Sequence, residues 1–472
     1  MPEKKVVTRF APSPTGFLHV GGVRTALYAY LWAKKNSGSF ILRIEDTDKA
    51  REVAGSIDHI IKSLKWVGIN WDQGPDIGGP HAPYLQSERL DSYKKYANVL
   101  IEKGHAYPDP YTNEEIDAFR KKAEEEKRPF LYREHRPESF GVWDGTQALR
   151  FKTPEIKSYK WSDVVRGELS AGPEALDDFI LIKSDGYPTY NFAHIIDDLE
   201  MGVTHIMRAD EFIASTPKFL ALYEALNITP PIFVSLPPIL GESGNKKLGK
   251  RDGAKDILDY QKEGYLPEAM FNFLALIGWN PGSGDNREVM SEQEIIDVFD
   301  LGHIQKSGGQ FNEEKLDWLN KEHIKRLAPE ITRKEVFSRL PEKMQNAMLI
   351  PLILDRVSKW SDIEGMVKDG ELDFFLKTPE VDKRKLNYKG CANDTTATHL
   401  KNISEILANI SEWSTEKIKT EVMAYADKTE KRGEVLHPFR YALSGLDKSP
   451  DPFTIAFILG RNETISRIQK VI

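Results

Sequence analysis

The chain has 472 residues, of which 40% are apolar and 29% charged, and its formal net charge at pH 7 is −7. This length exceeds what a single hydrophobic core supports, so we expect roughly three to five domains, and no apolar run is long enough to span a membrane. The single cysteine, Cys391, excludes an internal disulfide framework and favours a cytoplasmic location, while local basic faces still allow a nucleic-acid partner.

Residues 1–90 are predicted to form one half of a parallel α/β unit. Strands near 5–10 and 39–44 flank a helix at 22–35, and we expect MPEKKVVTRF to enter the first strand at once, without room for a signal peptide. In this helix and in the next one, apolar residues recur at the spacing of one buried helix face. These residues are Val23, Ala26, Leu27, Tyr30 and Leu31, then Ile57, Ile60, Ile61 and Leu64.

The loop between the first strand and the first helix has the sequence APSPTGFLHVGG. A strand, a tight loop and a helix N-terminus together present backbone N–H groups and the positive end of a dipole, which suits a nucleotide phosphate. His19 directly precedes the helix, where a ring nitrogen can donate to phosphate or adenine. An isolated H-x-G pattern is equally typical of a loop histidine, but the full run P-x-P-T-G-x-x-H-x-G-G is far more specific.

The pattern changes between residues 91 and 189. A charged helix is predicted at 113–127, and short strands in ALRFKT (148–153) and FILIKS (179–184). Basic side chains on this helix can contact phosphates, but its many glutamates favour a solvated helix. The segment AYPDPYT has no cysteine, and His105 and His135 alone do not make a tetrahedral site, so we expect no zinc and no other protein-held metal.

Two further segments carry polar or charged residues between apolar or glycine positions. In residues 185–212, short apolar strand or helix pieces (192–196 and 203–207) alternate with Tyr190, His194, Arg208 and Glu211. In residues 244–254, the sequence GNKKLGKRDGA combines glycines with Lys246, Lys247, Lys250 and Arg251. A cationic loop can neutralise charge that develops on a pyrophosphate leaving group, although an isolated charge run is usually a solvated loop.

From about residue 323 onward the apolar spacing is helical throughout. Pro438 fits an N-terminal helix position. The apolar series are Met344, Met348 and Leu352; Ile403, Ile406, Leu407 and Ile410; and Ile455, Ile458 and Leu459.

The loop run and the cationic segment resemble the two signatures of class I aminoacyl-tRNA synthetases, in the glutamyl/glutaminyl branch and its bacterial glutamyl form. The resemblance covers essentially the whole chain and implies an α/β fold: a Rossmann-type catalytic domain split by a mixed α/β insertion, then an all-helical C-terminal anticodon-binding region. The implied parts are the first catalytic half (1–90), the acceptor-end-binding insertion (91–189), the second catalytic half (190–245), the lysine loop with the stem-contact domain (246–322) and the anticodon-binding region (323–472).

The activity implied by the resemblance is ATP-dependent ligation of L-glutamate to tRNA(Glu) through a glutamyl-adenylate, with release of AMP and pyrophosphate. Mg²⁺ is expected to arrive with ATP, and members commonly need tRNA even for adenylate formation. We expect a cytoplasmic monomer.

The resemblance also implies roles for individual residues. Gly249 departs from the family pattern, because a serine is usual there. The implied catalytic residues are His19 and Lys250. The implied ATP-binding residues are Gly21, Gly22, Glu211, Lys247, Lys250 and Arg251. The implied glutamate-binding residues are Arg9, Ala11, Ser13, Glu45, Tyr190, His194 and Arg208.

The chemistry of these residues suits glutamate. Glu45 and Tyr190 can meet the α-ammonium, and Arg9 and Arg208 can hold the side-chain carboxylate through two-pronged hydrogen bonds. Structural alternatives remain open: Glu45 can pair locally, and Arg208 can form an ordinary surface ion pair. Many family members carry a different residue at the position of His194.

Four alternatives are weaker. A glutaminyl enzyme would leave Arg208 partly unpaired against a neutral amide and would carry β-barrels in place of the helical C-terminal region. A shortened paralogue that modifies a tRNA base would lack the last 150 or so residues. A small-molecule nucleotidyltransferase has no need of the helical region, and a non-catalytic tRNA-binding module has no need of both nucleotide motifs.

The family's anticodon-reading arginine aligns best with Arg356, in LILDRVSKWSDI. Glutamate and glutamine anticodons differ at their third base, cytosine or guanine. Arginine only donates hydrogen bonds, so it should favour cytosine over guanine, whose pairing edge carries donors. The chain is therefore predicted to discriminate between the two tRNAs, although a helix-surface arginine without a base contact fits the sequence nearly as well.

Overall fold

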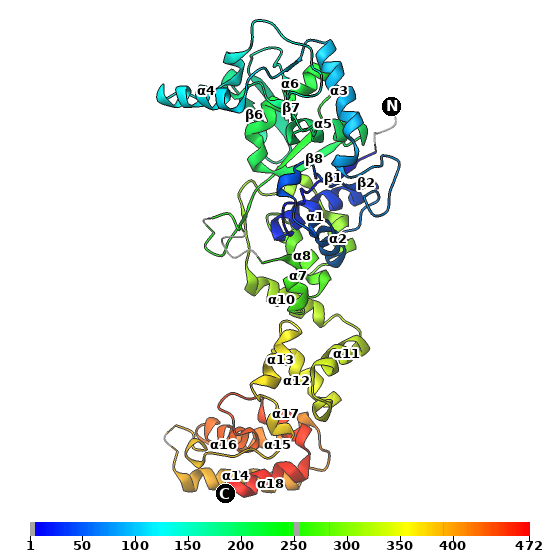
Figure 1. Cartoon of the computed structure of the whole chain (residues 1–472). Coiled ribbons are helices and arrows are strands. Elements are labelled where there is room, and N and C mark those ends of the chain that lie inside the picture. The colour runs from blue at the N-terminus through cyan, green and yellow to red at the C-terminus, as the bar shows by residue number, and fades with distance from the viewer. Residues whose placement is uncertain (1–4, 245, 250–254, 283, 390) are drawn as a thin grey trace. The chain divides into compact units, whose positions relative to one another are not determined.

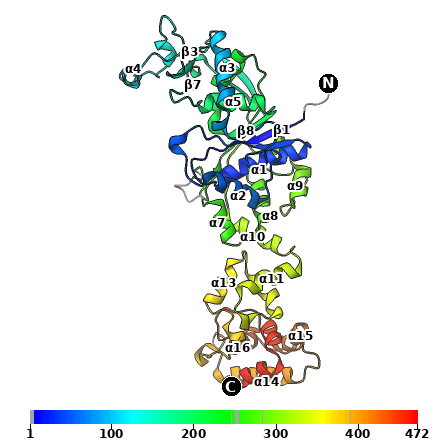
Figure 2. The same ribbon diagram turned by 45° about the vertical axis from the view of Figure 1, so that its right-hand side comes forward.

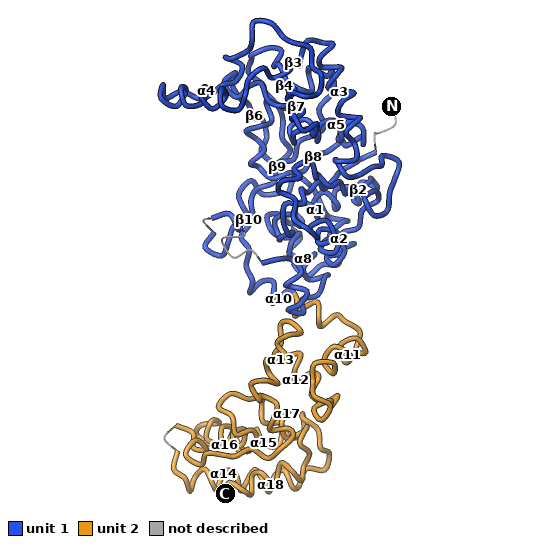
Figure 3. The backbone as a smooth tube through the Cα atoms, viewed as in Figure 1, with its two compact units in different colours: residues 1–319 blue, residues 320–472 orange. Residues whose placement is uncertain are grey.

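The computed structural model describes residues 5–244, 246–249, 255–282, 284–389 and 391–472. The chain divides into two compact units, Met1–Leu319 and Asn320–Ile472 (Figures 1 and 3). Among the described residues, no helix is both long and apolar enough to cross a membrane. The finer division into five parts stays a prediction.

The predicted βαβ arrangement at the N-terminus is confirmed. Strands β1 (Val7–Phe10) and β2 (Ser39–Leu42) pair in parallel, and helix α1 (Val20–Lys35) connects them. The helix begins at Val20 instead of Gly22. It packs against β1 and β2 and also against helix α8 (Pro267–Leu276), as Figures 1 and 2 show. This burial on several sides explains why α1 is apolar around most of its circumference.

A four-stranded sheet continues the first unit, in the order β6-β5-β9-β8. The start of β8 is joined to β1, because the Thr204 N–H donates to the Val7 carbonyl oxygen at 2.9 Å. The carboxyl ends of parallel strands β1, β2 and β8 therefore lie near one another, where ligands bind in open α/β sheets. The strands are β5 (Tyr159–Asp163), β6 (Gly167–Ala171), β8 (His205–Ala209) and β9 (Ile232–Leu236).

The structure resolves the two apolar pieces that the sequence left open between strand and helix. Residues 192–196 lie in helix α5 (Tyr190–Glu200), and residues 203–207 run into strand β8. Helix α6 (Thr216–Leu226) then leads from β8 to β9.

The insertion contains a three-stranded antiparallel sheet, β3-β4-β7, with helix α3 (Leu90–Glu102). The predicted charged helix is α4 (Asn113–Glu125), which starts at a capping box formed by Thr112 and Glu115. Only Ile116 and Ala123 of this helix are buried, as in a solvated helix. The strands are β3 (Ala106–Pro108), β4 (Leu149–Phe151) and β7 (Ile180–Ile182).

The remaining described part of the first unit is mostly helical, apart from one pair of short parallel strands, β10 and β11, and its last helix, α10, continues into the second unit. The bounds are α2 (Ser56–Val67), β10 (Ile239–Leu240), α7 (Ile257–Lys262), α9 (Glu292–Val298), β11 (Gly309–Gln310) and α10 (Glu313–Ile324).

The second unit holds helices and no strand in its described part, as predicted. One apolar series does not lie on a single helix, because Met344, Met348 and Leu352 belong to three separate helical segments. Met348 is also 43% exposed. The helices are α11 (Pro329–Arg339), α12 (Ile350–Arg356), α13 (Ser361–Lys368), α14 (Asn393–Ala408), α15 (Thr415–Ala426), α16 (Gly433–Ser444), α17 (Pro452–Leu459) and α18 (Arg461–Val471).

The position predicted for Pro438 was wrong. This proline lies inside α16, which begins at Gly433, so the helix loses the hydrogen bond that an N–H at Pro438 would make. Buried Val435, Phe439 and Ala442 lie on the same helix, and their packing outweighs the lost bond.

Candidate active site

The loop before α1 ends in a tightly packed helix start. His19 is the N-cap of α1, and its Nδ1 accepts a hydrogen bond from the Gly21 N–H at 3.1 Å. A Cβ atom at Gly22 would lie 2.6 Å from the Leu18 side chain, and one at Gly21 would lie 3.0 Å from the His19 ring. The first turn of α1 carries no acidic residue, so the positive end of its dipole is available to an anion.

The same loop lies beside the end of β2. The Glu45 N–H donates to the Pro12 carbonyl oxygen at 3.0 Å. Ala11, which is half-buried, and Ser13, which is exposed, flank Pro12 on either side. The structure therefore brings these two predicted glutamate-binding residues to Glu45.

Arg9 of β1 is buried and pairs with Asp198 of α5. Its Nε lies 3.1 Å from Asp198 Oδ1, its Nη2 lies 3.1 Å from Oδ2, and its Nη1 donates to the Met207 carbonyl oxygen at 3.3 Å. A guanidinium has five N–H groups. Within the part of the chain that the structure describes, Arg9 thus keeps one unpaired N–H on each terminal nitrogen.

A second buried arginine, Arg43, connects the same carboxylate to Glu45. Its Nη1 donates to Asp198 Oδ1 at 2.8 Å and its Nη2 to Glu45 Oε1 at 3.0 Å, while its Nε lies 3.5 Å from Asp197 Oδ2. The side chain of Arg43 is fully buried. Burial opposes its charge, but the three carboxylates raise the pKa of Arg43 well above its usual value.

Sequence reasoning missed Arg43, Asp197 and Asp198. A signal was present, because all three interrupt the apolar runs FILRIED and NFAHIIDDLE. Charged residues inside an element that is otherwise buried need partners of opposite charge. The runs do not say which partner each one takes, because the partners lie far apart in the chain.

Two of these three carboxylates, Glu45 and Asp198, have pKa values that are shifted in opposite directions. Burial raises the pKa of Glu45 to about 7, although Arg43 and Arg9 oppose this change. Burial also disfavours ionisation of Asp198, but Arg9 and Arg43 outweigh it and hold the pKa of Asp198 well below its usual value. Asp198 is therefore a permanent anion, whereas Glu45 gains its charge near neutral pH.

Arg208 of β8 lies in an aromatic pocket. Its Nη2 donates to the Thr216 hydroxyl at 3.1 Å, and its guanidinium lies 4.9 Å from the centre of the Phe219 ring. Among the described residues Arg208 forms no ion pair, and its buried Nη1 has no hydrogen-bond partner. Burial lowers the pKa of Arg208, and nearby Tyr190 opposes this shift. A buried cation with an unpaired donor favours an anionic ligand.

Tyr190 and His194 lie on consecutive turns of α5, next to this pocket. Their rings stack with centres 4.6 Å apart, and His194 Nδ1 donates to the Tyr190 carbonyl oxygen at 2.7 Å. Burial lowers the pKa of His194 to about 3, so this imidazole is neutral. Burial also raises the pKa of the Tyr190 hydroxyl to about 12, so the hydroxyl keeps its proton.

The described part of the cationic segment lies against the end of β8. Lys247 Nζ lies 2.7 Å from Glu211 Oε2, which joins two of the predicted ATP-binding residues. Both side chains are more than half exposed, so the pair is weak and can yield to a stronger ligand. Lys250 and Arg251, also predicted to bind ATP, lie outside the described residues.

The insertion contains a compact ionic and aromatic cluster in the region where the sequence predicts no zinc site. Asp109 accepts hydrogen bonds from Arg150 (Nε at 3.0 Å) and from the Tyr132 hydroxyl. The His135 ring stacks on Phe119 with centres 4.1 Å apart. Within the described residues no three His, Cys, Asp or Glu side chains are grouped so as to hold a metal ion. The absence of zinc stays a prediction.

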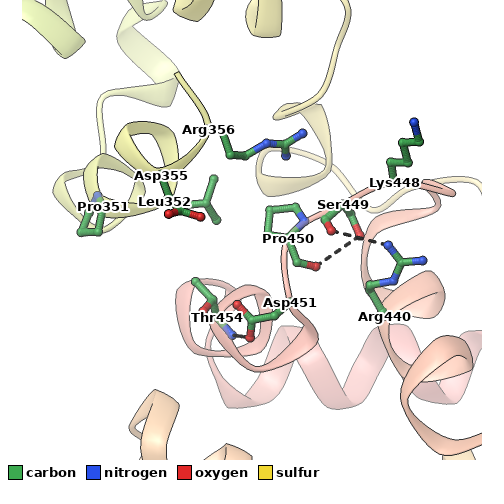
Figure 4. A pocket seen from close by; sticks show the side chains of 10 residues that line it. All are labelled: Pro351, Leu352, Asp355, Arg356, Arg440, Lys448, Ser449, Pro450, Asp451 and Thr454. Atoms are coloured by element: carbon green, nitrogen blue, oxygen red, sulfur yellow. Dashed lines mark hydrogen bonds between the residues drawn. The ribbon is translucent and has the colours of Figure 1, made fainter. Parts of the chain in front are cut away.

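The second unit has a cavity of about 670 Å³ at the end of α12, and Arg356 is one of its lining residues (Figure 4). Arg356 also forms an ion pair with Glu371. Three basic and two acidic side chains line this cavity, so it suits a polar ligand that both accepts and donates hydrogen bonds. The lining residues are Pro351, Leu352, Asp355, Arg356, Arg440, Lys448, Ser449, Pro450, Asp451 and Thr454.

Two family models match this chain, and together they cover both units. A model described as the catalytic domain of class I tRNA synthetases (E and Q) matches residues 5–318. A model described as an anticodon binding domain matches residues 310–472.

Similar proteins match over the full length. A glutamate–tRNA ligase of Clostridium acetobutylicum is 41% identical, covering 99% of this chain and 98% of its own. One of Clostridium botulinum (Eklund 17B) is 39% identical, covering 100% and 99%. The crystal structure of a glutamate tRNA ligase from Elizabethkingia meningosepticum in complex with its amino acid matches with a TM-score of 0.85 and 36% identity, over 99% of both chains.

Proposed function

The chain belongs to the class I tRNA synthetases (E and Q), and we propose that it attaches L-glutamate to tRNA(Glu) in an ATP-dependent reaction. The α-carboxylate of glutamate attacks the α-phosphate of ATP, which forms glutamyl-adenylate and releases pyrophosphate. A ribose hydroxyl of the terminal adenosine of the tRNA then attacks the activated carbonyl and releases AMP. No side chain acts as a covalent nucleophile, so the protein contributes positioning and electrostatic stabilisation.

The observation that carries the choice of glutamate is the unpaired buried charge of Arg208. The side-chain carboxylate of glutamate supplies both a negative charge and two acceptors for this guanidinium. The neutral amide of glutamine would leave the charge uncompensated, at a cost of about 1–3 kcal/mol for an unmet buried group. Arg208 therefore favours glutamate over glutamine.

The rest of the amino-acid site surrounds the same edge of the sheet. Arg9 keeps two N–H groups for the substrate, and Glu45 is an anion above about pH 7 that suits the α-ammonium. Tyr190 and His194 form one wall beside Arg208, while Ala11 and Ser13 lie on the loop that contacts Glu45. We assign all seven predicted residues to glutamate binding.

ATP is proposed to lie at the N-terminus of α1. His19, Gly21 and Gly22 form the helix start, and Glu211 and Lys247 lie at the end of β8 and in the cationic segment. We assign the departing phosphates to Lys250 and Arg251, with His19 and Lys250 as catalytic residues. Mg²⁺ enters as the MgATP complex, whose phosphates and water supply its ligands.

The tRNA is proposed to contact three further parts: residues 91–189 at its acceptor end, 246–322 along its stem and 323–472 at its anticodon. Arg356 in the cavity of the second unit is assigned to the third anticodon base. We also propose that the protein is a cytoplasmic monomer and holds no zinc.

Amino-acid-dependent ATP–pyrophosphate exchange, with and without tRNA, tests the proposed function. We expect exchange with glutamate and not with glutamine, stimulated by tRNA. Exchange with glutamine would assign the chain to the other branch of the family, and exchange with neither amino acid would overturn the proposal.

A further inference from the structure

His59 of α2 lies between two segments that are far apart in the sequence. Its Nε2 lies 2.7 Å from Asp256 Oδ2 and 2.9 Å from Oδ1, and its Nδ1 accepts a hydrogen bond from the Leu18 N–H at 3.3 Å. The ring also stacks on Phe17, with centres 4.5 Å apart and planes 20° apart. The imidazole therefore contacts both the loop before α1 and the start of α7.

These two segments also contact each other through the backbone. The Ile257 N–H donates to the Leu18 carbonyl oxygen at 3.2 Å, and His19 forms an antiparallel bridge with Asp256. Asp256 is in addition the N-cap of α7, where its Oδ1 accepts from the Leu258 N–H at 2.9 Å. Asp256 thus fixes the start of α7 and the imidazole at the same time.

The partners of His59 define its tautomer. The Leu18 N–H can only donate, so Nδ1 carries no proton, and Nε2 carries the proton that it donates to Asp256. Ser63 Oγ lies 3.2 Å from the same Nδ1 and donates to it as well. The side chain of His59 is 11% exposed, so water competes little for these bonds.

We infer that His59 is a positioning residue for ATP, which it serves by tying Leu18, the neighbour of the helix cap His19, to Asp256. This inference rests on the proposed binding of ATP at His19, Gly21 and Gly22. The imidazole does not contact the nucleotide; it limits the positions that residues 17–19 can adopt. A loop held in its binding position loses less conformational freedom when ATP binds. The His59–Asp256 pair therefore improves the affinity for ATP and leaves the affinity for glutamate unchanged.

Three variants of His59 separate its bond to Leu18 from its bond to Asp256. His59→Asn places an oxygen near the position of Nδ1 and keeps an acceptor for Leu18, whereas His59→Gln places a donor near the position of Nε2 and keeps the bond to Asp256. His59→Leu keeps neither. From the other side, Asp256→Ser keeps a helix N-cap but is too short to reach the imidazole, and Asp256→Asn keeps both functions.

The experiment measures the KM for ATP and the KM for glutamate in tRNA-dependent pyrophosphate exchange. We expect His59→Leu and Asp256→Ser each to raise the KM for ATP about tenfold and to leave the KM for glutamate within about twofold. His59→Asn and His59→Gln should lie between these variants and the unmodified protein, and Asp256→Asn should lie close to the unmodified protein. The double variant His59→Leu/Asp256→Ser should be no worse than the worse single variant, because both remove the same contact.

His205→Leu serves as the matched control. His205 also bonds a neighbouring side chain through its imidazole (Nδ1 to Thr204 Oγ1, 2.8 Å), but it lies at the start of β8. We expect the KM for ATP of this variant to be unchanged.

An unchanged KM for ATP in a folded Asp256→Ser protein, with folding verified by circular dichroism, would overturn the inference. Equal changes in the KM for ATP and for glutamate would do so as well, since they would indicate a general structural role. If the unmodified protein shows no glutamate-dependent exchange, the proposed function itself has failed, which is a distinct result.

Discussion

Arg9 and Asp198 are 189 positions apart in the chain, yet one side of the Arg9 guanidinium pairs with the Asp198 carboxylate through two hydrogen bonds of 3.1 Å. This pair fixes the plane of the guanidinium and leaves its two remaining N–H groups for a ligand. Arg43 donates to the same carboxylate and also to Glu45. Asp198 therefore orients Arg9 directly and Glu45 through Arg43.

Asp198→Asn should raise the KM for glutamate about tenfold or more, because the orientation of Arg9 is then no longer fixed. It should also lower the free energy of unfolding of the first unit by about 3 kcal/mol, since two buried arginines lose an anionic partner. Glutamate kinetics and thermal unfolding measure both effects. Asp185→Asn, at an exposed ion pair, is the control. An unchanged KM for glutamate would show that Arg9 does not depend on Asp198.

Arg208→Gln should weaken the use of glutamate by roughly 2–4 kcal/mol in kcat/KM, with little change in the KM for ATP. The reason is that the variant removes the charge facing the side-chain carboxylate and keeps only a shorter, neutral polar group. Arg208→Lys is the matched variant, because it keeps the charge but cannot form two parallel hydrogen bonds. If the KM for glutamate stays the same in both variants, Arg208 does not bind the substrate.

Lys250→Ala should lower the rate of adenylate formation by a factor on the order of a hundred or more and leave tRNA binding largely intact. The proposed role of this lysine is to compensate charge that develops on pyrophosphate in the transition state. Lys246→Ala, in the same segment, is the control and should keep most of its activity. Pyrophosphate exchange and a tRNA filter-binding assay separate the two effects. Near-normal exchange in Lys250→Ala would remove this lysine from the mechanism.

The pKa of Glu45, which burial raises to about 7, predicts a pH dependence of glutamate use. Below pH 7 the side chain is protonated and attracts the α-ammonium weakly, so kcat/KM for glutamate should rise between about pH 6 and pH 8. Glu45→Gln should have a lower and flatter profile over this range. A profile of unchanged shape in Glu45→Gln would mean that another group titrates.

The same shift predicts an effect on stability. Folding raises the pKa of Glu45 above its unfolded value of 4.5, so its contribution to stability is fully present below about pH 4.5 and is lost as the pH rises through 7. The free energy of unfolding of Glu45→Gln, relative to that of the unmodified protein, should therefore increase as the pH rises from 5 to 8. Thermal unfolding across this range checks the sign.

Arg356→Gln should reduce the discrimination between glutamate and glutamine tRNAs, because glutamine both donates and accepts hydrogen bonds whereas arginine only donates. We expect the unmodified protein to charge glutamate tRNA far better. Transcripts of both tRNAs, charged side by side with each protein, provide the measurement. Equal charging of both by the unmodified protein would contradict the assignment of Arg356.

The local elements and the family can be predicted from the amino-acid sequence alone. Apolar spacing predicted α1 and α2, the glycines and His19 predicted the start of α1 to within two residues, and the helical spacing after residue 323 predicted the second unit. These features depend on residues within a few turns of one another, where backbone geometry and side-chain periodicity act directly. Both signatures are likewise short segments, so the resemblance that they carry needed no tertiary information.

Which charged groups contact one another depends on the tertiary structure. The sequence contains Arg43, Asp198, His59 and Asp256 without indicating their partners, since a burial pattern says that a charge needs compensation but not from where. The Arg9–Asp198 pair forms because parallel strands and their crossovers bring distant segments to one edge of the sheet. The His59–Asp256 pair forms because helix α2 packs against helix α7. The pKa of Glu45 and the unpaired Nη1 of Arg208 follow from the same packing, because both depend on how far neighbouring elements exclude water from these side chains.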